Sequence, residues 1–272
     1  MKGYETLERI FQEHARTLKG EERKEYVEGI PERIYGVKGK VFGIQGILES
    51  AERWNISEQF LLSLPYRENL PRLSTQMTED SCGTNTISTG MGIKFGRIIT
   101  EHEVCKINAE TFKKHVKEKR KGIDGCGDGL NPIDFRNLFQ YLAASYLGKN
   151  PRVFTTNNGT VEQLEYFHQK GALMIINRQW GKPLDDDPHW GGNHWELCFG
   201  IDNFNDNVVL HNPSNTPDHD YDYKISGLHA VPKKDFIDWW LTIVSGKECR
   251  SYITVYPRNG PLPKDFPKGR FL

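Results

Sequence analysis

Cys82 is the first candidate for chemistry, because its neighbours are unusual for a structural thiol. It stands in the segment STQMTEDSCGTNTISTGMG, flanked by Asp, Ser, Gly, Thr and Asn, whereas a structural cysteine is usually a small buried apolar residue. Asp80 or Ser81 can cap a helix beginning here, which places Cys82 in the first turn. There the helix dipole favours the thiolate over the thiol. By itself, this context leaves a nucleophile and a structural thiol equally open.

A histidine lies at the start of a predicted strand, HWELCFGID (194–202), which two glycines precede. Side chains alternate along a strand. One face is therefore expected to form a core stripe of Trp195, Leu197, Phe199 and Ile201. His194, Glu196 and Cys198 are expected on the other face. A lone histidine before a strand is more often a surface residue, but the glycines leave room for close backbone approach beside a cleft.

Asn212 ends the next predicted strand, NVVLHN (207–212), eighteen residues after His194. The even spacing predicts that the two share a face. They lie directly opposite only if the turn centres near Asn203; a turn near Asn205 offsets them by four residues, and a bulge or bend must then close the gap. Asn212 would accept a hydrogen bond from the His194 ring and hold the useful tautomer.

Gln76 lies six residues before Cys82. Its side-chain amide and the Cys82 backbone N–H could together form an oxyanion hole for a tetrahedral intermediate. Without the other candidates, the simpler interpretation is a solvated loop glutamine.

The elements that must position these residues change along the chain. The first seventy residues read as helical, and Ser57 is a plausible N-cap; prolines at 65 and 71 mark a boundary. We therefore expect a helical N-terminal extension (1–70) and a second domain (71–272). Further helices are predicted at 80–96, 108–121, 132–147 and 161–170, and strands at 172–180, 194–202, 207–212 and 251–256. Helices first and strands last indicate an α+β fold.

The bulk composition excludes several classes of partner. Thirty-six basic residues balance thirty-six acidic ones, so charge gives no case for nucleic acid. No apolar run is long enough for a membrane span, and the N-terminus has no secretory signal, which favours a cytoplasmic protein. Five cysteines without regular spacing favour free thiols, with one unpaired cysteine and two disulfides as the alternative. No cofactor motif is present.

The ordered pattern resembles the papain-like cysteine peptidases that process bacteriocin leaders after a double glycine, a family with many free-standing relatives. It consists of Gln76-x5-Cys82-Gly83, Gly192-Asn193-His194-Trp195, Gly200-Ile201-Asp202 and Asn212-Pro213. The resemblance extends to GLNPIDFRNLFQYL (129–142), VEQLEYFHQKGALMIIN (161–177) and KKDFIDWW (233–240), and it covers roughly residues 71–256.

The resemblance implies a papain-like two-lobe fold, with the cysteine at a helix N-terminus packed on an antiparallel sheet that carries His and Asn. It implies Cys82 as nucleophile, His194 as base and then acid, Asn212 as the orienting residue and Gln76 in the oxyanion hole. The substrate would be a peptide or protein. The chain departs from the family in having Asn212 where an Asp is usual, and it has no transporter domains.

Three rival interpretations stay open. The same triad could catalyse another acyl transfer, such as deamidation or transglutamination, because these reactions share the thioester and differ in what resolves it. A degenerate domain could bind peptides without catalysis. A metal could use the crowded acidic and histidine side chains of 185–220, although no HExxH helix is present. These side chains are Asp185, Asp186, Asp187, His189, His194, His211, Asp218, His219 and Asp220.

Overall fold

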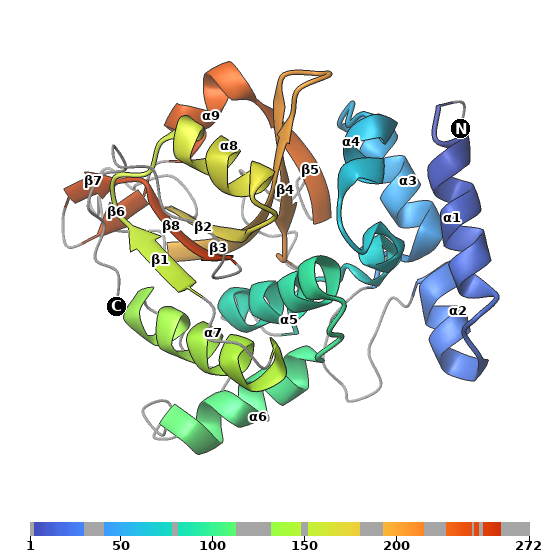
Figure 1. The fold of residues 1–272 in the computed structure, drawn as a ribbon, viewed down its shortest axis with the longest axis horizontal. Coiled ribbons are helices and arrows are strands. Elements are labelled where there is room, and N and C mark those ends of the chain that lie inside the picture. The colour runs from blue at the N-terminus through green and yellow to red at the C-terminus, as the bar shows by residue number, and fades with distance from the viewer. Residues whose placement is uncertain are drawn as a thin grey trace, which may run out of the picture.

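The computed structural model describes residues 3–29, 41–77, 81–112, 132–147, 152–179, 193–214, 227–240, 242–244 and 247–256. An antiparallel sheet of six strands lies at its centre, in the order β1-β8-β2-β3-β4-β5 (Figure 1). The strands are β1 (Arg152–Thr156), β2 (Leu173–Gln179), β3 (Asn193–Asp202), β4 (Asn207–Asn212), β5 (Gly227–Pro232) and β8 (Ser251–Tyr256). A separate two-stranded sheet pairs β6 (Thr242–Val244) with β7 (Lys247–Cys249).

Helices precede the sheet in sequence and then alternate with its strands. The first five are α1 (Glu5–Ala15), α2 (Gly20–Glu28), α3 (Gly43–Arg53), α4 (Glu58–Ser63) and the 3-10 helix η1 (Arg67–Arg72). The others are α5 (Cys82–Phe95), α6 (Glu101–Phe112), α7 (Pro132–Leu147), α8 (Val161–Gln169) and α9 (Lys233–Trp239). No described helix is long and apolar enough to cross a membrane.

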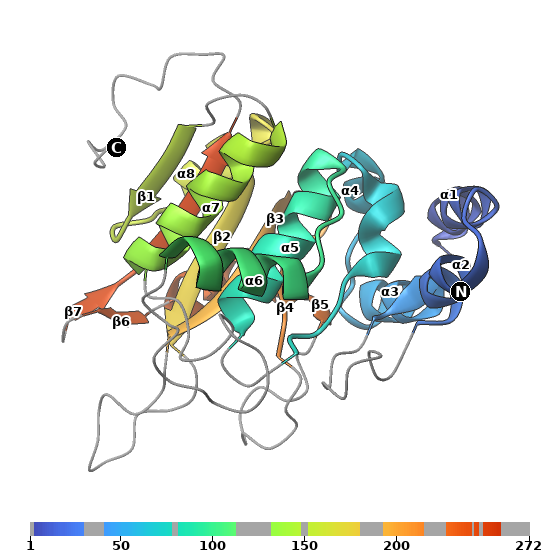
Figure 2. The same cartoon turned by 90° about the horizontal axis from the view of Figure 1, so that it is seen from below.

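The two faces of the sheet build two different cores. One face packs against α5 and α7, with α6 packed on α5, and the other is covered by α8 and α9 (Figures 1 and 2). Gly90 lets α5 come close, because a Cβ there would lie 2.9 Å from a Leu173 methyl carbon and 3.3 Å from one of Leu197. The second core includes Leu164 of α8 and Trp240, both fully buried.

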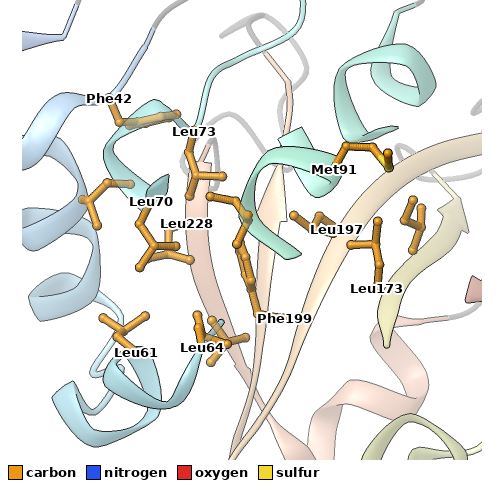
Figure 3. Close-up of a cluster of buried hydrophobic side chains, with 14 of the residues drawn as sticks. Phe42, Leu61, Leu64, Leu70, Leu73, Met91, Leu173, Leu197, Phe199 and Leu228 are labelled. Carbon is orange, nitrogen blue, oxygen red and sulfur yellow. The ribbon is translucent and has the colours of Figure 1, made fainter. Parts of the chain in front are cut away.

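The N-terminal helices share the first core with α5 and the sheet. Figure 3 shows Leu61, Leu64 and Leu70 beside Leu228 and Phe199. The contact is also polar, because the Asp202 carboxylate accepts hydrogen bonds from the Ser57 backbone N–H and hydroxyl, both at 2.7 Å. The described part of residues 1–70 is thus joined to the sheet by core packing and by part-buried hydrogen bonds.

Most predicted elements match the structure. The helix predicted at 132–147 is α7, 161–170 is α8, and Ser57 does cap α4 by accepting the Phe60 N–H. The helix predicted at 108–121 is wrong in its start, because α6 begins at Glu101 and its described part ends at Phe112. The mixed helices and antiparallel sheet confirm the α+β class. The two-lobe description and the boundary at residue 70 remain predictions.

Candidate active site

Cys82 is the first residue of α5, and Ser81 occupies the N-cap position. The Ser81 side chain accepts no capping hydrogen bond from the helix, and Asp80, the other predicted cap, lies outside the described residues. The Cys82 side chain is buried, with 5% of the residue exposed. Backbone N–H groups at a helix start present partial positive charge, which favours an anion at this position.

The first turn of α5 is held against the start of β3. The Thr86 hydroxyl lies 2.7 Å from the Cys82 carbonyl oxygen and 3.1 Å from that of Trp195, and it can donate its hydrogen to either. Trp195 directly follows His194, and its ring stacks on Phe135 of α7 at 4.3 Å between centroids. The helix turn of Cys82 and the strand residue next to His194 are therefore packed together.

His194 and Asn212 are joined by a hydrogen bond of 2.9 Å between the histidine Nε2 and the amide Oδ1. The same Oδ1 accepts the backbone N–H of Ser214 at 2.9 Å, and this donor fixes which atom of the amide is the oxygen. An amide oxygen only accepts, so Nε2 must carry the hydrogen. In the neutral ring Nδ1 is then left with the lone pair that can accept a proton.

A β-bulge brings these two residues onto one face. Asp202 pairs with Asn207, and this register continued without interruption would place Asn212 opposite Leu197, on the core face. The pairing shifts between Cys198 and Gly200, so that Leu197 pairs with His211 instead. Asn212 then falls opposite Glu196, diagonal to His194 and within side-chain reach. The even spacing in sequence was not sufficient; the bulge supplies the shared face.

The same bulge corrects one sequence prediction. Trp195, Leu197 and Phe199 lie in the core under α5, as expected from their alternation. Ile201 was expected with them, but it belongs to the opposite core, with Val208 and Leu210. The extra residue in the strand reverses the alternation after Phe199.

Gln76 lies in a buried segment that is tied to both sides of the site. Its backbone N–H donates to the Pro213 carbonyl oxygen at 2.6 Å, directly after Asn212. The next N–H, of Met77, reaches both carboxylate oxygens of Glu101 at 3.2 Å. Only 3% of Gln76 is exposed, so the interpretation as a solvated loop residue is wrong.

Two buried polar residues that the sequence did not single out hold this segment in place. Asn85, on the first turn of α5, donates through Nδ2 to the Thr75 carbonyl oxygen at 3.2 Å and to Glu101 Oε2 at 2.9 Å. Asn85 and Glu101 are both fully buried. Asn85 follows Cys82 by three residues, a spacing that places both on neighbouring turns of one helix and could have indicated Asn85 from the sequence. No sequence pattern indicated Glu101.

A charged cluster lies on the sheet face of His194. The Arg178 Nε donates to Glu196 Oε1 at 2.7 Å, and the same oxygen lies 3.7 Å from His194 Nε2. The other carboxylate oxygen lies 3.5 Å from His229 Nε2. All four side chains are buried. Glu196 was expected on this face, whereas Arg178 comes from the neighbouring strand β2 and His229 from β5, one strand beyond β4, and neither was foreseen.

Burial has the largest effect on the pKa of His194. It lowers the pKa of the imidazole from 6.5 to about 4, since a buried cation loses its hydration; Glu196 and the Asn212 hydrogen bond oppose this effect, and Arg178 and His229 add to it. At neutral pH the ring is uncharged. Its Nδ1 can therefore accept a proton.

Cys198 and Cys105 are less suited to nucleophilic chemistry than Cys82. Burial raises the pKa of the Cys198 thiol to about 12, which keeps it protonated. Cys82 and Cys198 form no disulfide, but Cys105 is disulfide-bonded, so the expectation of free thiols is wrong at Cys105. A disulfide is more typical of oxidising compartments, and the cytoplasmic location stays a prediction.

Within the described ranges, no group of three or more His, Cys, Asp or Glu side chains is arranged to hold a metal ion. His211, one candidate ligand, instead donates from Nε2 to the Ser74 carbonyl oxygen at 3.1 Å. The acidic and histidine residues at 185–189 and 218–220 lie outside the described residues.

Comparisons with known proteins add little to this geometry. No family model matches the chain, and no curated protein matches it. Among solved structures, the chain is similar to one named as a C39-like peptidase from Bacillus anthracis, with 14% identity. The match covers 68% of this chain and 93% of that one, with a TM-score of 0.40. So slight a likeness assigns no activity to this chain.

Proposed function

We propose that the protein is a papain-like cysteine peptidase that cleaves a peptide or amide bond through Cys82, His194 and Asn212. The observation that carries the proposal is the hydrogen bond from His194 Nε2 to the Asn212 oxygen, next to a helix that begins at Cys82. This bond turns the basic Nδ1 away from Asn212 and leaves it available for the thiol. The ordered motifs shared with the leader-processing peptidases support the same assignment.

In the proposed reaction, the Cys82 thiol transfers its proton to His194 Nδ1 and the thiolate attacks the substrate carbonyl carbon. The Cys82 backbone N–H and the Gln76 side-chain amide donate to the resulting oxyanion. His194 then returns its proton to the leaving amine, and a thioester remains on Cys82. Water, deprotonated by His194, attacks the thioester, releasing the acid and regenerating the thiol.

The fixed segment that carries Gln76 supports its assignment to the oxyanion hole. An oxyanion donor is useful only if it is held in place before the charge develops. Residues 75–77 are tied to α5 through Asn85, to α6 through Glu101 and to the end of β4 through Pro213. These contacts leave the Gln76 backbone little freedom.

An electrophilic peptide probe that reacts with active thiolates tests the nucleophile. We expect folded protein to be labelled at Cys82, as read by mass spectrometry of the digested chain. Cys82→Ala should lose this labelling and all turnover of a peptide library while keeping the unfolding midpoint. The matched control Cys198→Ala should remain active. Labelling of other thiols with Cys82 untouched would overturn the proposal.

The products distinguish hydrolysis from the other acyl transfers. Hydrolysis of a peptide bond gives a new carboxyl terminus, deamidation converts a glutamine to a glutamate, and transfer to an added amine gives a new amide. We expect the first in the absence of added amine. If glutamate or amide products dominate, the triad stands but the reaction class changes.

A further inference from the structure

Glu196 is a buried carboxylate that the proposed mechanism does not use. It follows His194 by two residues on β3, so both side chains lie on the same face of the sheet. None of Glu196 is exposed, and its Oε1 lies 3.7 Å from His194 Nε2. The carboxylate is thus close to the same edge of the ring that Asn212 holds, without displacing the Asn212 hydrogen bond.

The proposed chemistry places a positive charge on the buried His194 ring. When Cys82 gives its proton to His194, the buried imidazole becomes a cation, and a buried cation is costly unless an anion is near. The family that the sequence resembles usually has an Asp where this chain has Asn212. The amide orients the ring but carries no charge.

We propose that Glu196 is a positioning residue for His194 and supplies, near the Nε2 edge of the ring, the negative charge that the residue at 212 lacks. This inference rests on the proposed function. The interaction is electrostatic, because 3.7 Å is too long for a hydrogen bond and Nε2 already donates to Asn212.

The neighbours of Glu196 fit this role. Arg178 Nε, at 2.7 Å, fixes the carboxylate and offsets part of its field, and His229 faces its other oxygen. Cys198, next on the same face, is neutral because burial raises the pKa of its thiol. Glu196 raises the pKa of His194 by more than Arg178 lowers it, although the lowering caused by burial is larger than either effect.

The test replaces Glu196 with Gln, which has the same shape and no charge. The rate of Cys82 alkylation by iodoacetamide, followed against pH by mass spectrometry, reports how much thiolate the site holds. We expect Glu196→Gln to raise the apparent pKa of the Cys82 thiol by about one pH unit, a tenfold loss of thiolate below that pKa. The catalytic efficiency, kcat/KM, should fall by about the same factor.

Two further variants separate this role from a structural one. The double variant Glu196→Gln/Asn212→Asp moves the charge to the other partner of Nε2 and should restore alkylation and turnover. Arg178→Met breaks the same buried ion pair but keeps the carboxylate, so it should leave the thiol pKa unchanged or lower it. A structural role predicts instead that both single variants weaken the site alike and that Asp at 212 rescues nothing.

The outcomes also distinguish the inference from the proposed function. Unchanged alkylation in a folded Glu196→Gln protein, or no rescue by Asn212→Asp, overturns the role of Glu196 while Cys82 remains a reactive thiol. If the unaltered protein shows no reactive Cys82, the proposed function itself fails. Should Glu196→Gln alone not fold, the double variant, which keeps the charge of the cluster, decides the question.

Discussion

The side-chain oxygen of Asn212 accepts two hydrogen bonds, one from the Ser214 backbone N–H and one from His194 Nε2. The backbone donor is fixed by the chain, so it determines the orientation of the amide and through it the tautomer of the histidine. A residue of this kind acts on the reaction by holding its neighbour in one protonation pattern.

Replacing Asn212 with Ala should lower kcat by roughly 100-fold, because His194 loses the acceptor that fixes its tautomer. KM should change little, since Asn212 is fully buried and out of reach of substrate. Steady-state kinetics on a cleaved peptide measure both. The control Asn205→Ala, in the β3–β4 turn, should keep full activity. An Asn212→Ala protein with normal kcat would contradict the orienting role.

At the scale of elements, the bulge in β3 decides the geometry of the site. Gly200, at the bulge, has φ +132°, a backbone conformation that residues with a side chain rarely adopt. A Cβ there would also collide with the His168 ring. The His168 ring in turn lies 2.9 Å, through Nδ1, from the Phe199 carbonyl oxygen. Glycine is therefore required where the strand changes register, and the register determines whether His194 and Asn212 can meet.

Gly200→Ala should lower the free energy of unfolding by about 3 kcal/mol, from backbone strain together with the overlap on His168. Gly171→Ala is the matched control. Gly171 also has positive φ, +67°, but its Cβ would meet nothing within 4 Å, so it should cost only about 1 kcal/mol. Urea unfolding measures both. Equal losses would mean that the close approach to His168 does not matter.

At the scale of the whole molecule, the N-terminal helices belong to the same core as α5 and the sheet. Leu61, Leu64 and Leu70 are fully buried in that core, and Ser57 is bound to Asp202. This packing favours an N-terminal segment whose described helices complete the core; the alternative is a lid that covers the candidate active site and inhibits it.

Removal of residues 1–69 should therefore leave a chain that does not fold, because it exposes the apolar surface around Leu228 and Phe199. Circular dichroism and a thermal melt of the shortened chain test this expectation. A folded chain that is more active than the full-length protein would instead support the lid.

The buried histidines should make the whole molecule sensitive to acid. Burial lowers the pKa of His194 from 6.5 to about 4 and that of His211 from 6.5 to about 3. The unfolded chain takes up these protons below pH 6.5, whereas the folded chain does not until near its own lower pKa. Stability therefore falls as the pH falls from about 6.5 toward 4, by about 1.4 kcal/mol per pH unit for each histidine.

Urea unfolding at a series of pH values measures this slope. His211→Gln keeps a donor for the Ser74 carbonyl oxygen and should reduce the proton uptake on unfolding by about one. A stability that stays flat between pH 6.5 and 5 would contradict the neutral state of these side chains.

The sequence by itself determined the α+β class and most helices and strands. It also supplied the candidate site residues, through their order along the chain. Helix 132–147 and the strands at 194–202 and 207–212 follow from local periodicity, which acts between near neighbours. The choice of Cys82, His194, Asn212 and Gln76 came from residue types in an ordered pattern.

Only the tertiary structure decided how these residues meet. The bulge before Gly200 depends on the packing of the strand against its neighbours and against His168, which no local pattern reports. Glu101, Arg178 and His229 reach the site from α6, β2 and β5, so their contribution depends on long-range packing and was invisible in sequence. The even spacing of His194 and Asn212 does not by itself place them on one face of the sheet. Which residues of two paired strands share a face depends on the register of the pairing, and here the bulge sets that register.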